Sequence, residues 1–303
     1  MVKTAAQKPM RIRSSAADRI FLTFNTIFLT IIMLVILLPL LNILASSFSD
    51  TLAVNTGKVW FWPVGWNLKG YKMVFEYPQV MRGYANTILY TVCGSACGVF
   101  LTFLAAYPLS RKDFFGRNLF MGLITFTMLF SGGLIPSYLL NKSLGLVDNR
   151  LVMIIPGSVS AMNVIIARTF LMSNIPDELL DATRIDGAND FQFLTRIVIP
   201  LSTTIIAVLA LWYAVGHWNS YTTAIIYLRT ASKYPLQVVL RNILILSQTA
   251  EMLMDTRQQA EFAAMQDLIK YALIVVASVP MLILYPFLQK YFVRGIMIGS
   301  LKG

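Results

Sequence analysis

Six stretches of this 303-residue chain contain no aspartate, glutamate, lysine or arginine, and each is at least 17 residues long. A helix needs about 20 predominantly apolar residues to cross the hydrocarbon core of a membrane. Backbone polar groups in lipid must find partners within their own segment, so we expect each stretch to be helical. The six stretches are Ile20–Ser49, Gly83–Ser110, Asn118–Asn141, Leu151–Ala167, Ile197–Leu228 and Tyr271–Gln289.

The composition also favours a membrane protein. Hydrophobic residues make up 57% of the chain, charged residues make up only 13%, and the mean hydropathy is +0.67. A soluble domain carries about 25% charged residues. We therefore predict an all-α membrane protein with six transmembrane helices in a single domain, residues 1–303. The expected spans are about 20–46, 84–108, 118–140, 151–171, 199–228 and 270–290, with a polar segment at 173–200.

The basic residues predict a partner and an orientation. The net charge is +11, but these residues are scattered and form no stripe with aromatic residues, which favours anionic lipid over nucleic acid. Lysine and arginine near spans concentrate on the cytoplasmic side, so we expect both termini, the loop "SRKDFFGRN" and the polar segment to lie there. The terminal basic residues are Lys3, Lys8, Arg11, Arg13, Arg19, Lys290, Arg294 and Lys302.

The expected spans contain no charged side chain in their interiors. Ion-coupled transporters and proton pumps usually place such groups within the bilayer. The polar residues here are uncharged: Asn86, Asn163, Asn219, His217 and several hydroxyl residues. This pattern favours passage of a neutral, hydrogen-bonding solute, or no transport. The nucleotide-binding motif G-x-x-x-x-G-K-[ST] is absent from the chain, so energy from ATP would have to come from another polypeptide.

We expect neither a metal nor a cofactor in this chain. His217 is its single histidine, and its two cysteines, Cys93 and Cys97, lie four residues apart in an apolar stretch. Cysteine in such surroundings behaves as a small hydrophobic residue. Gly94 and Gly98 in the same stretch form a small-xxx-small pattern, which lets helices approach closely.

The polar segment between the fourth and fifth spans predicts a short helix that ends at a glycine. Pro176 suits a first helical position, and Asp177 and Glu178 in the first turn complement the helix dipole. Gly187 can adopt the left-handed conformation that ends a helix. We therefore expect a helix from about Pro176 to Asp186.

A second short helix is expected after the glycine. Asn189 or Asp190 can cap it. Its apolar face is expected to hold Phe191, Leu194 and Val198. The helix–glycine–helix segment has two interpretations: a simple amphipathic connector, or a lever that a cytoplasmic partner grips through the carboxylates.

The segment "DATRIDGA" followed by "IVIP" resembles the EAA loop of importer permeases of the ATP-binding-cassette class. The family pattern is approximately E-A-A-x-x-D-G-A, followed by I-x-L-P. This chain departs from it at Asp181, where the family usually has glutamate, and at Thr183, where it has alanine. The match covers Ala182, Asp186, Gly187, Ala188, Ile197 and Pro200, together with Asp181, which keeps the charge of the usual glutamate.

Five further blocks extend the resemblance over most of the chain. They are "NTILYTV", "AAYPLSRKDFFGRN", "GGLIPSYLLNKSLGLVDN", "GHWNSYTTAIIYL" and "KYFVRGIMIGSLKG". All are similar to carbohydrate-uptake (MalG-like) permeases, and the third and last are closest to the LplC/YtcP branch. The resemblance implies a MetI-like type I importer fold with cytoplasmic coupling helices.

The resemblance also implies a non-catalytic subunit in a bacterial cytoplasmic membrane. Its expected partners are a second homologous permease, a cytoplasmic ATPase dimer that binds ATP and Mg, and an extracellular or periplasmic sugar-binding protein. The expected substrate is a neutral sugar or oligosaccharide. The residues expected to couple the chain to the ATPase are Asp181, Ala182, Thr183, Arg184, Asp186, Gly187 and Ala188.

The fifth span contains the candidates for the substrate path. They combine stacking faces with hydrogen-bonding groups, which suits pyranose rings, although packing against the partner permease is an alternative role. The candidates are His217, Trp218, Asn219 and Tyr221. For the whole chain, a secondary transporter or channel for a neutral solute and a membrane-bound sugar-processing enzyme are the rival interpretations.

Overall fold

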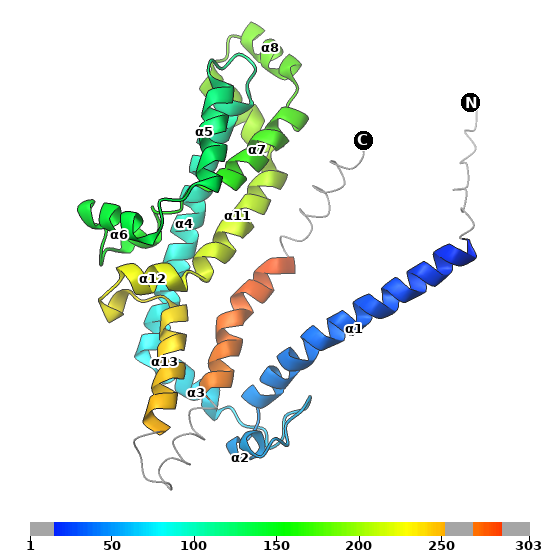
Figure 1. Ribbon diagram of the computed structural model, residues 1–303, viewed down its shortest axis with the longest axis vertical. Helices are drawn as coiled ribbons and strands as arrows, with labels where there is room; N and C mark the ends of the chain where they lie inside the picture. The colour runs from blue at the N-terminus through cyan, green and yellow to red at the C-terminus, as the bar shows by residue number, and fades with distance from the viewer. Residues whose placement is uncertain (1–14, 252–268, 287–303) are drawn as a thin grey trace. The chain divides into compact units, whose positions relative to one another are not determined.

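The computed structural model describes residues 15–251 and 269–286 (Figure 1). Most of the basic residues at the two ends, and the terminal block "GIMIGSLKG", lie outside the described residues. The chain divides into two units, Met1–Leu68 and Lys69–Gly303. Helices form all the regular structure in the described residues, as the sequence predicts.

The first unit consists mainly of one long apolar helix. Helix α1 (Ala16–Ser47) has 32 residues, which corresponds to about 48 Å at 1.5 Å per residue. It begins where the backbone N–H of Ser15 donates to the Asp18 carboxylate at 2.9 Å. Its large apolar side chains are exposed on all sides, which is typical of a helix surrounded by lipid. A short helix, α2 (Thr51–Asn55), follows it.

The second unit holds the remaining helices, and three of them build its centre. Its elements are α3 (Lys69–Glu76), α4 (Pro78–Ser110), α5 (Arg117–Leu129), α6 (Leu134–Ser143), η1 (Arg150–Met153), α7 (Ala161–Asn174), α8 (Asp177–Ile185), α9 (Asp190–Phe193), η2 (Leu194–Val198), α10 (Ile199–Leu201), α11 (Thr203–Trp218), α12 (Tyr221–Tyr227), η3 (Ala231–Lys233), α13 (Leu236–Glu251) and the helix Ile269–Pro286. Figure 1 shows α4, α7 and α11 side by side, and their apolar side chains form the largest buried cluster.

Two glycines of α4 let α11 approach closely. A methyl group at Gly98 would lie 2.9 Å from the ring of Tyr213, and one at Gly94 would overlap the ring of His217. The hydroxyls of Thr102 and Tyr213 also hydrogen-bond at 2.7 Å across this contact. The predicted role of the two glycines in close helix packing is therefore confirmed.

Within residues 15–251 and 269–286, three helices are long and apolar enough to cross a membrane on their own: α1, α4 and Ile269–Pro286. The third expected span, 118–140, is not one straight helix but the pair α5 and α6, bent by 115°. The chain turns there at Gly133, whose φ of +80° suits glycine better than other residues. The length and mean hydropathy of the expected span do not reveal this bend, because Gly132 and Gly133 barely change either quantity.

The fourth and fifth expected spans also differ from single helices. The fourth, 151–171, has its α-helix only from Ala161, because Pro156 and Gly157 (φ +83°) interrupt the preceding chain. The fifth, 199–228, holds α11 and then α12. The chain bends by 80° at Ser202, next to Pro200 and just after the π-helix η2. Prolines and π-helical turns are common causes of such bends.

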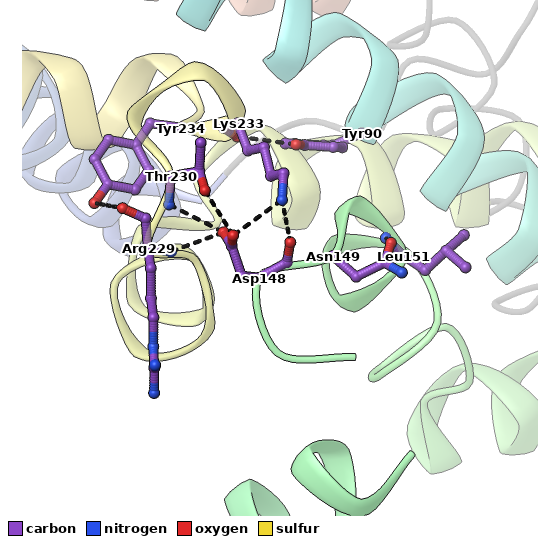
Figure 2. Close-up of polar contacts among 8 residues, drawn as sticks. All are labelled: Tyr90, Asp148, Asn149, Leu151, Arg229, Thr230, Lys233 and Tyr234. Atoms are coloured by element: carbon purple, nitrogen blue, oxygen red, sulfur yellow. Dashed lines mark hydrogen bonds and ion pairs between the residues drawn. The ribbon is translucent and has the colours of Figure 1, made fainter. Parts of the chain in front are cut away.

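Asp148 ties the segment before η1 to the segment after α12 (Figure 2). Its carboxylate accepts hydrogen bonds from Thr230 Oγ1 at 2.6 Å and from the backbone N–H groups of Thr230 and Arg229, both at 3.0 Å. Lys233 Nζ lies 3.0 Å from the same carboxylate, and Tyr90 of α4 donates to the Lys233 carbonyl at 2.9 Å. These donors hold the pKa of Asp148 well below its ordinary value.

Candidate functional site

The predicted helix–glycine–helix segment is present, with α8 as its first helix. Pro176 is the N-cap rather than the first helical residue, and Asp177 and Glu178 occupy the first turn. Gly187 has a φ of +78°. Its N–H donates to Arg184 O at 3.0 Å, and the next N–H, of Ala188, donates to the carbonyl five residues back at 3.1 Å. This paired bonding is the Schellman motif, so Gly187 ends the helix as predicted.

The second helix begins at the cap that the sequence indicates. Asn189 Oδ1 accepts from the Gln192 N–H at 2.8 Å, and Gln192 Oε1 accepts from the Asn189 N–H at 3.0 Å, which together form a capping box. The expected apolar face is partly wrong. Leu194 and Val198 are buried, but Phe191 is 71% exposed. Phe193 is buried in its place and packs against Tyr107 of α4, with ring centroids 6.4 Å apart.

The outward face of α8 combines acidic, small and apolar residues. Asp181 and Ala182 are exposed, and Ile185 between them on the helix surface is 87% exposed. Thr183 is 8% exposed and faces inward with Leu180. Sequence reasoning missed Ile185. Its position 200° around the helix from Thr183 is the signal that would have placed it on the outward face.

Asp186 and Gly187 are also exposed, and Ala188 is half-buried. Arg184 is exposed but turns back toward the loop between α4 and α5. The expected coupling residues therefore divide into an outward group and two residues, Thr183 and Arg184, that hold the helix to the rest of its unit.

The loop between α4 and α5 anchors α8 through ion pairs. Asp113 lies 3.0 Å from the guanidinium of Arg111 and 2.9 Å from that of Arg184. Their hydrogen bonds, that of Arg111 foremost, lower the pKa of Asp113 to about 2. Lys112 pairs with Asp177 at 2.6 Å, which raises the pKa of the lysine. The loop "SRKDFFGRN" thus meets the first and last turns of α8, which the sequence alone does not reveal.

Trp218, expected on the substrate path, lies in the core instead. It is 4% exposed, and its Nε1 donates to Ala277 O of the helix Ile269–Pro286 at 3.1 Å. Its ring meets Tyr84 of α4 edge-on, with centroids 5.8 Å apart. These contacts join α11 to α4 and to the helix Ile269–Pro286.

The other three candidates lie close together in the chain: the backbone N–H of Asn219 donates to His217 O, and that of Tyr221 donates to Asn219 O at 2.7 Å. Asn219 Nδ2 donates to Val215 O at 2.9 Å within its own helix end. The Arg241 guanidinium lies 5.6 Å from the centre of the Tyr221 ring. His217 lines a cleft.

That cleft lies where the first turn of α7 meets α11 and the start of α12, and its volume is about 310 Å³. It combines hydroxyl, amide, imidazole and indole groups, which bind uncharged polar ligands through hydrogen bonds and ring contacts. None of the described residues that line it is acidic. They are Met153, Pro156, Gly157, Ser160, Asn163, Trp212, Tyr213, Gly216, His217, Ser220 and Thr223.

Long apolar helices, with an exposed polar segment anchored between two of them, are typical of helical membrane proteins. The model of one family, described as "Binding-protein-dependent transport system inner membrane component", matches residues 98–298. The chain therefore belongs to this family. Its members are membrane translocation components and not catalytic subunits.

Two curated relatives from Bacillus subtilis (strain 168) align with nearly the whole chain. Protein LplC is 41% identical over 290 residues, which cover 96% of this chain and 97% of LplC. The polygalacturonan/rhamnogalacturonan transport system permease protein YtcP is 41% identical over 283 residues, 91% of this chain and 96% of YtcP. The predicted similarity to ATP-binding-cassette permeases of the LplC/YtcP branch is confirmed.

A solved structure shares the fold. It is described as a bacterial ABC transporter involved in the import of the acidic polysaccharide alginate. One of its chains matches this one with a TM-score of 0.83 and 35% identity, over 93% of this chain and 100% of that chain. The predicted importer-permease fold class is therefore confirmed.

Proposed function

We propose that this chain is the permease subunit of an ATP-driven importer of sugars or oligosaccharides. Membership of the family supports a role in binding-protein-dependent transport. The names of YtcP and of the alginate transporter support a substrate derived from polysaccharides. The chain would form six spans in a bacterial cytoplasmic membrane, with both termini in the cytoplasm.

In this proposal three kinds of partner complete the transporter. A second homologous permease pairs with this chain, and an external sugar-binding protein delivers the substrate. A cytoplasmic ATPase dimer binds ATP and Mg, because this chain has no nucleotide-binding motif. The ATPase grips the segment from α8 to α10.

The exposed face of α8 carries the proposal. A helix that serves only as a connector gains nothing from an isoleucine that is 87% exposed, as Ile185 is. Burying such a side chain stabilises a complex by about 1.5–3 kcal/mol. The same reasoning applies to Phe191, which follows the turn at Gly187 and is 71% exposed: its burial by a partner would also stabilise a complex. Asp181 beside Ile185 offers a carboxylate to a basic or backbone donor on the ATPase.

Motion of α8 would pass to the membrane helices through its inward face. Leu180 belongs to the buried cluster that also contains residues of α4, α7 and α11. The pair between Arg184 and Asp113 adds a polar contact to the loop that follows α4. Closure of the ATPase dimer would thus move α8 and the ends of three helices together.

Asp181→Ala tests the coupling. We expect the variant to insert normally but to lose most substrate-stimulated ATP hydrolysis in the reconstituted complex, because the carboxylate is exposed and supports no described contact within the chain. Glu76→Ala removes another exposed carboxylate, from α3, and is the control, with activity expected near that of the unmodified complex. Normal stimulation in the Asp181 variant would contradict the coupling role. Uptake that persists without any ATPase would favour the secondary transporter or channel.

A further inference from the structure

We propose that the loop after α2, residues 56–68, is a membrane-surface anchor for α1. In this inference Trp60, Trp62 and Trp66 lie among the lipid headgroups on the membrane face opposite to the amino terminus. We call this segment the tryptophan loop. The inference concerns the first unit alone and does not depend on the substrate that the transporter carries.

Hydrogen bonds hold the tryptophan loop beside the carboxyl-terminal end of α1 (Figure 1). Asn42 Nδ2 of α1 donates to the carbonyls of Val59 and Trp60 at 2.9 and 3.1 Å. Further along the loop, the backbone N–H of Val64 donates to Ser49 Oγ at 3.0 Å. Val59 is itself buried. The loop therefore turns back along the helix, and its backbone has a defined position relative to Asn42.

The indole rings that this backbone carries remain exposed. Trp60 is 68% exposed, Trp62 is 82% exposed and Trp66 is 74% exposed. They are three of the five tryptophans in the chain. An exposed apolar patch of this kind marks a surface that meets a protein or a membrane. Tryptophan is enriched at the membrane–water interface, because its ring is apolar and its N–H needs a polar partner.

The length of α1 places the tryptophan loop at the level of this interface. Every residue from Ala16 to Leu40 is exposed, and the sequence contains no charged residue between Arg19 and Asp50. Asn42 follows Arg19 by 23 residues, which corresponds to about 35 Å along the helix. The hydrocarbon core of a membrane is about 30 Å thick. If Arg19 lies at one interface, Asn42 and the loop bonded to it lie at the other.

Exposure and charge support lipid as the partner of the loop. Leu40 is 56% exposed, whereas Ala45, Ser46 and Ser47 are all buried. The surface of α1 that suits lipid thus ends close to the level at which the tryptophan loop begins to cover the helix. Lys58 is the one charged residue in the sequence of the loop, and a lysine near the surface is attracted to anionic headgroups.

A spin label in the loop tests this location. The label is attached at Trp62→Cys in a variant without Cys93 and Cys97. The full chain and the subunits that co-purify with it are reconstituted in vesicles of phosphatidylethanolamine and phosphatidylglycerol. Collisions with oxygen, which concentrates in lipid, and with a water-soluble nickel complex report the depth of the label. We expect it within about 10 Å of the boundary between headgroups and acyl chains.

A label at Leu29→Cys is the control for depth. Leu29 is 54% exposed and lies near the middle of the charge-free part of α1, so its label should meet oxygen and not the nickel complex. If the label at position 62 meets the nickel complex as freely as a label in water does, the loop does not contact the membrane and the inference is wrong. Protection from both reagents would also overturn it, because a protein partner would then cover the loop.

Substitution of the three tryptophans tests the anchoring of α1. The readout is the depth of a label at Leu40→Cys. Tyrosine at positions 60, 62 and 66 keeps rings that suit the interface and should leave this depth unchanged. Glutamate at the same positions should expel the loop from the headgroups and shift the label outward by about 5 Å, one helical turn. Equal depth in the two variants would overturn the anchoring role. The depth at position 62 tests the inference even if the glutamate variant does not insert.

Discussion

Gly187 is the residue on which the shape of the exposed segment depends. Its φ of +78° is unfavourable for most side chains, but an added Cβ would meet no atom within 4 Å, so only backbone strain opposes substitution. Asparagine and aspartate tolerate this conformation better than other residues.

We expect Gly187→Asn and Gly187→Asp both to insert in the membrane, with a loss of stability of about 1 kcal/mol or less. The aspartate variant should also lose most co-purification of the ATPase, because it adds a charge at the proposed docking face. Equal recovery of the ATPase with both variants would contradict docking at this turn.

At the scale of elements, the loop after α4 holds α8 through Asp113, and this contact should depend on pH. The pKa of Asp113 in the folded protein is about 2, below its ordinary value of 3.8. Its contribution to stability is therefore fully present above about pH 4 and is lost as the pH falls toward 2. The side chains of Asp113 and Arg184 are 52% and 49% exposed, so solvent screening limits the contribution to about 1 kcal/mol or less.

The variant Asp113→Asn tests this contact. We expect its unfolding temperature to lie below that of the unmodified protein by a constant amount from pH 5 to 8, and the difference between the two temperatures to shrink below pH 4. Glu76→Gln, in an exposed pair within α3, is the control. A gap that widens with acid would contradict the assigned ion pair.

At the scale of the whole molecule, the basic amino terminus predicts the orientation in the membrane, with both termini in the cytoplasm. Phe115, in the loop after α4, is 96% exposed, and Leu144, just after α6, is 62% exposed. In a variant without Cys93 and Cys97, we expect Leu144→Cys to react with a membrane-impermeant maleimide in intact cells. Phe115→Cys should react only in inverted vesicles. The reverse pattern would overturn the orientation, and labelling of both positions from one side would contradict the bent span that separates them.

Much of this protein follows from local signals in its sequence. Long charge-free stretches predict apolar helices because lipid leaves the backbone no other partner. The turn between α8 and α9 can be predicted from Gly187 and Asn189, because a left-handed residue and a helix cap depend only on the nearest few residues. The bends in the third, fourth and fifth spans are harder to predict, because their glycines and prolines hardly alter length or hydropathy.

Only the tertiary structure decides which polar side chains remain available for function. Asn86, Asn163 and Asn219 occur in similar apolar surroundings in the sequence. Asn219 bonds within its own helix, and Asn86 finds a partner 146 residues away. Asn163 is 8% exposed and lines a cleft. The sequence determines that these amides must be satisfied, because burial of an unpaired polar group is unfavourable. Which of them is left for a ligand depends on contacts between distant segments, which only the fold brings together.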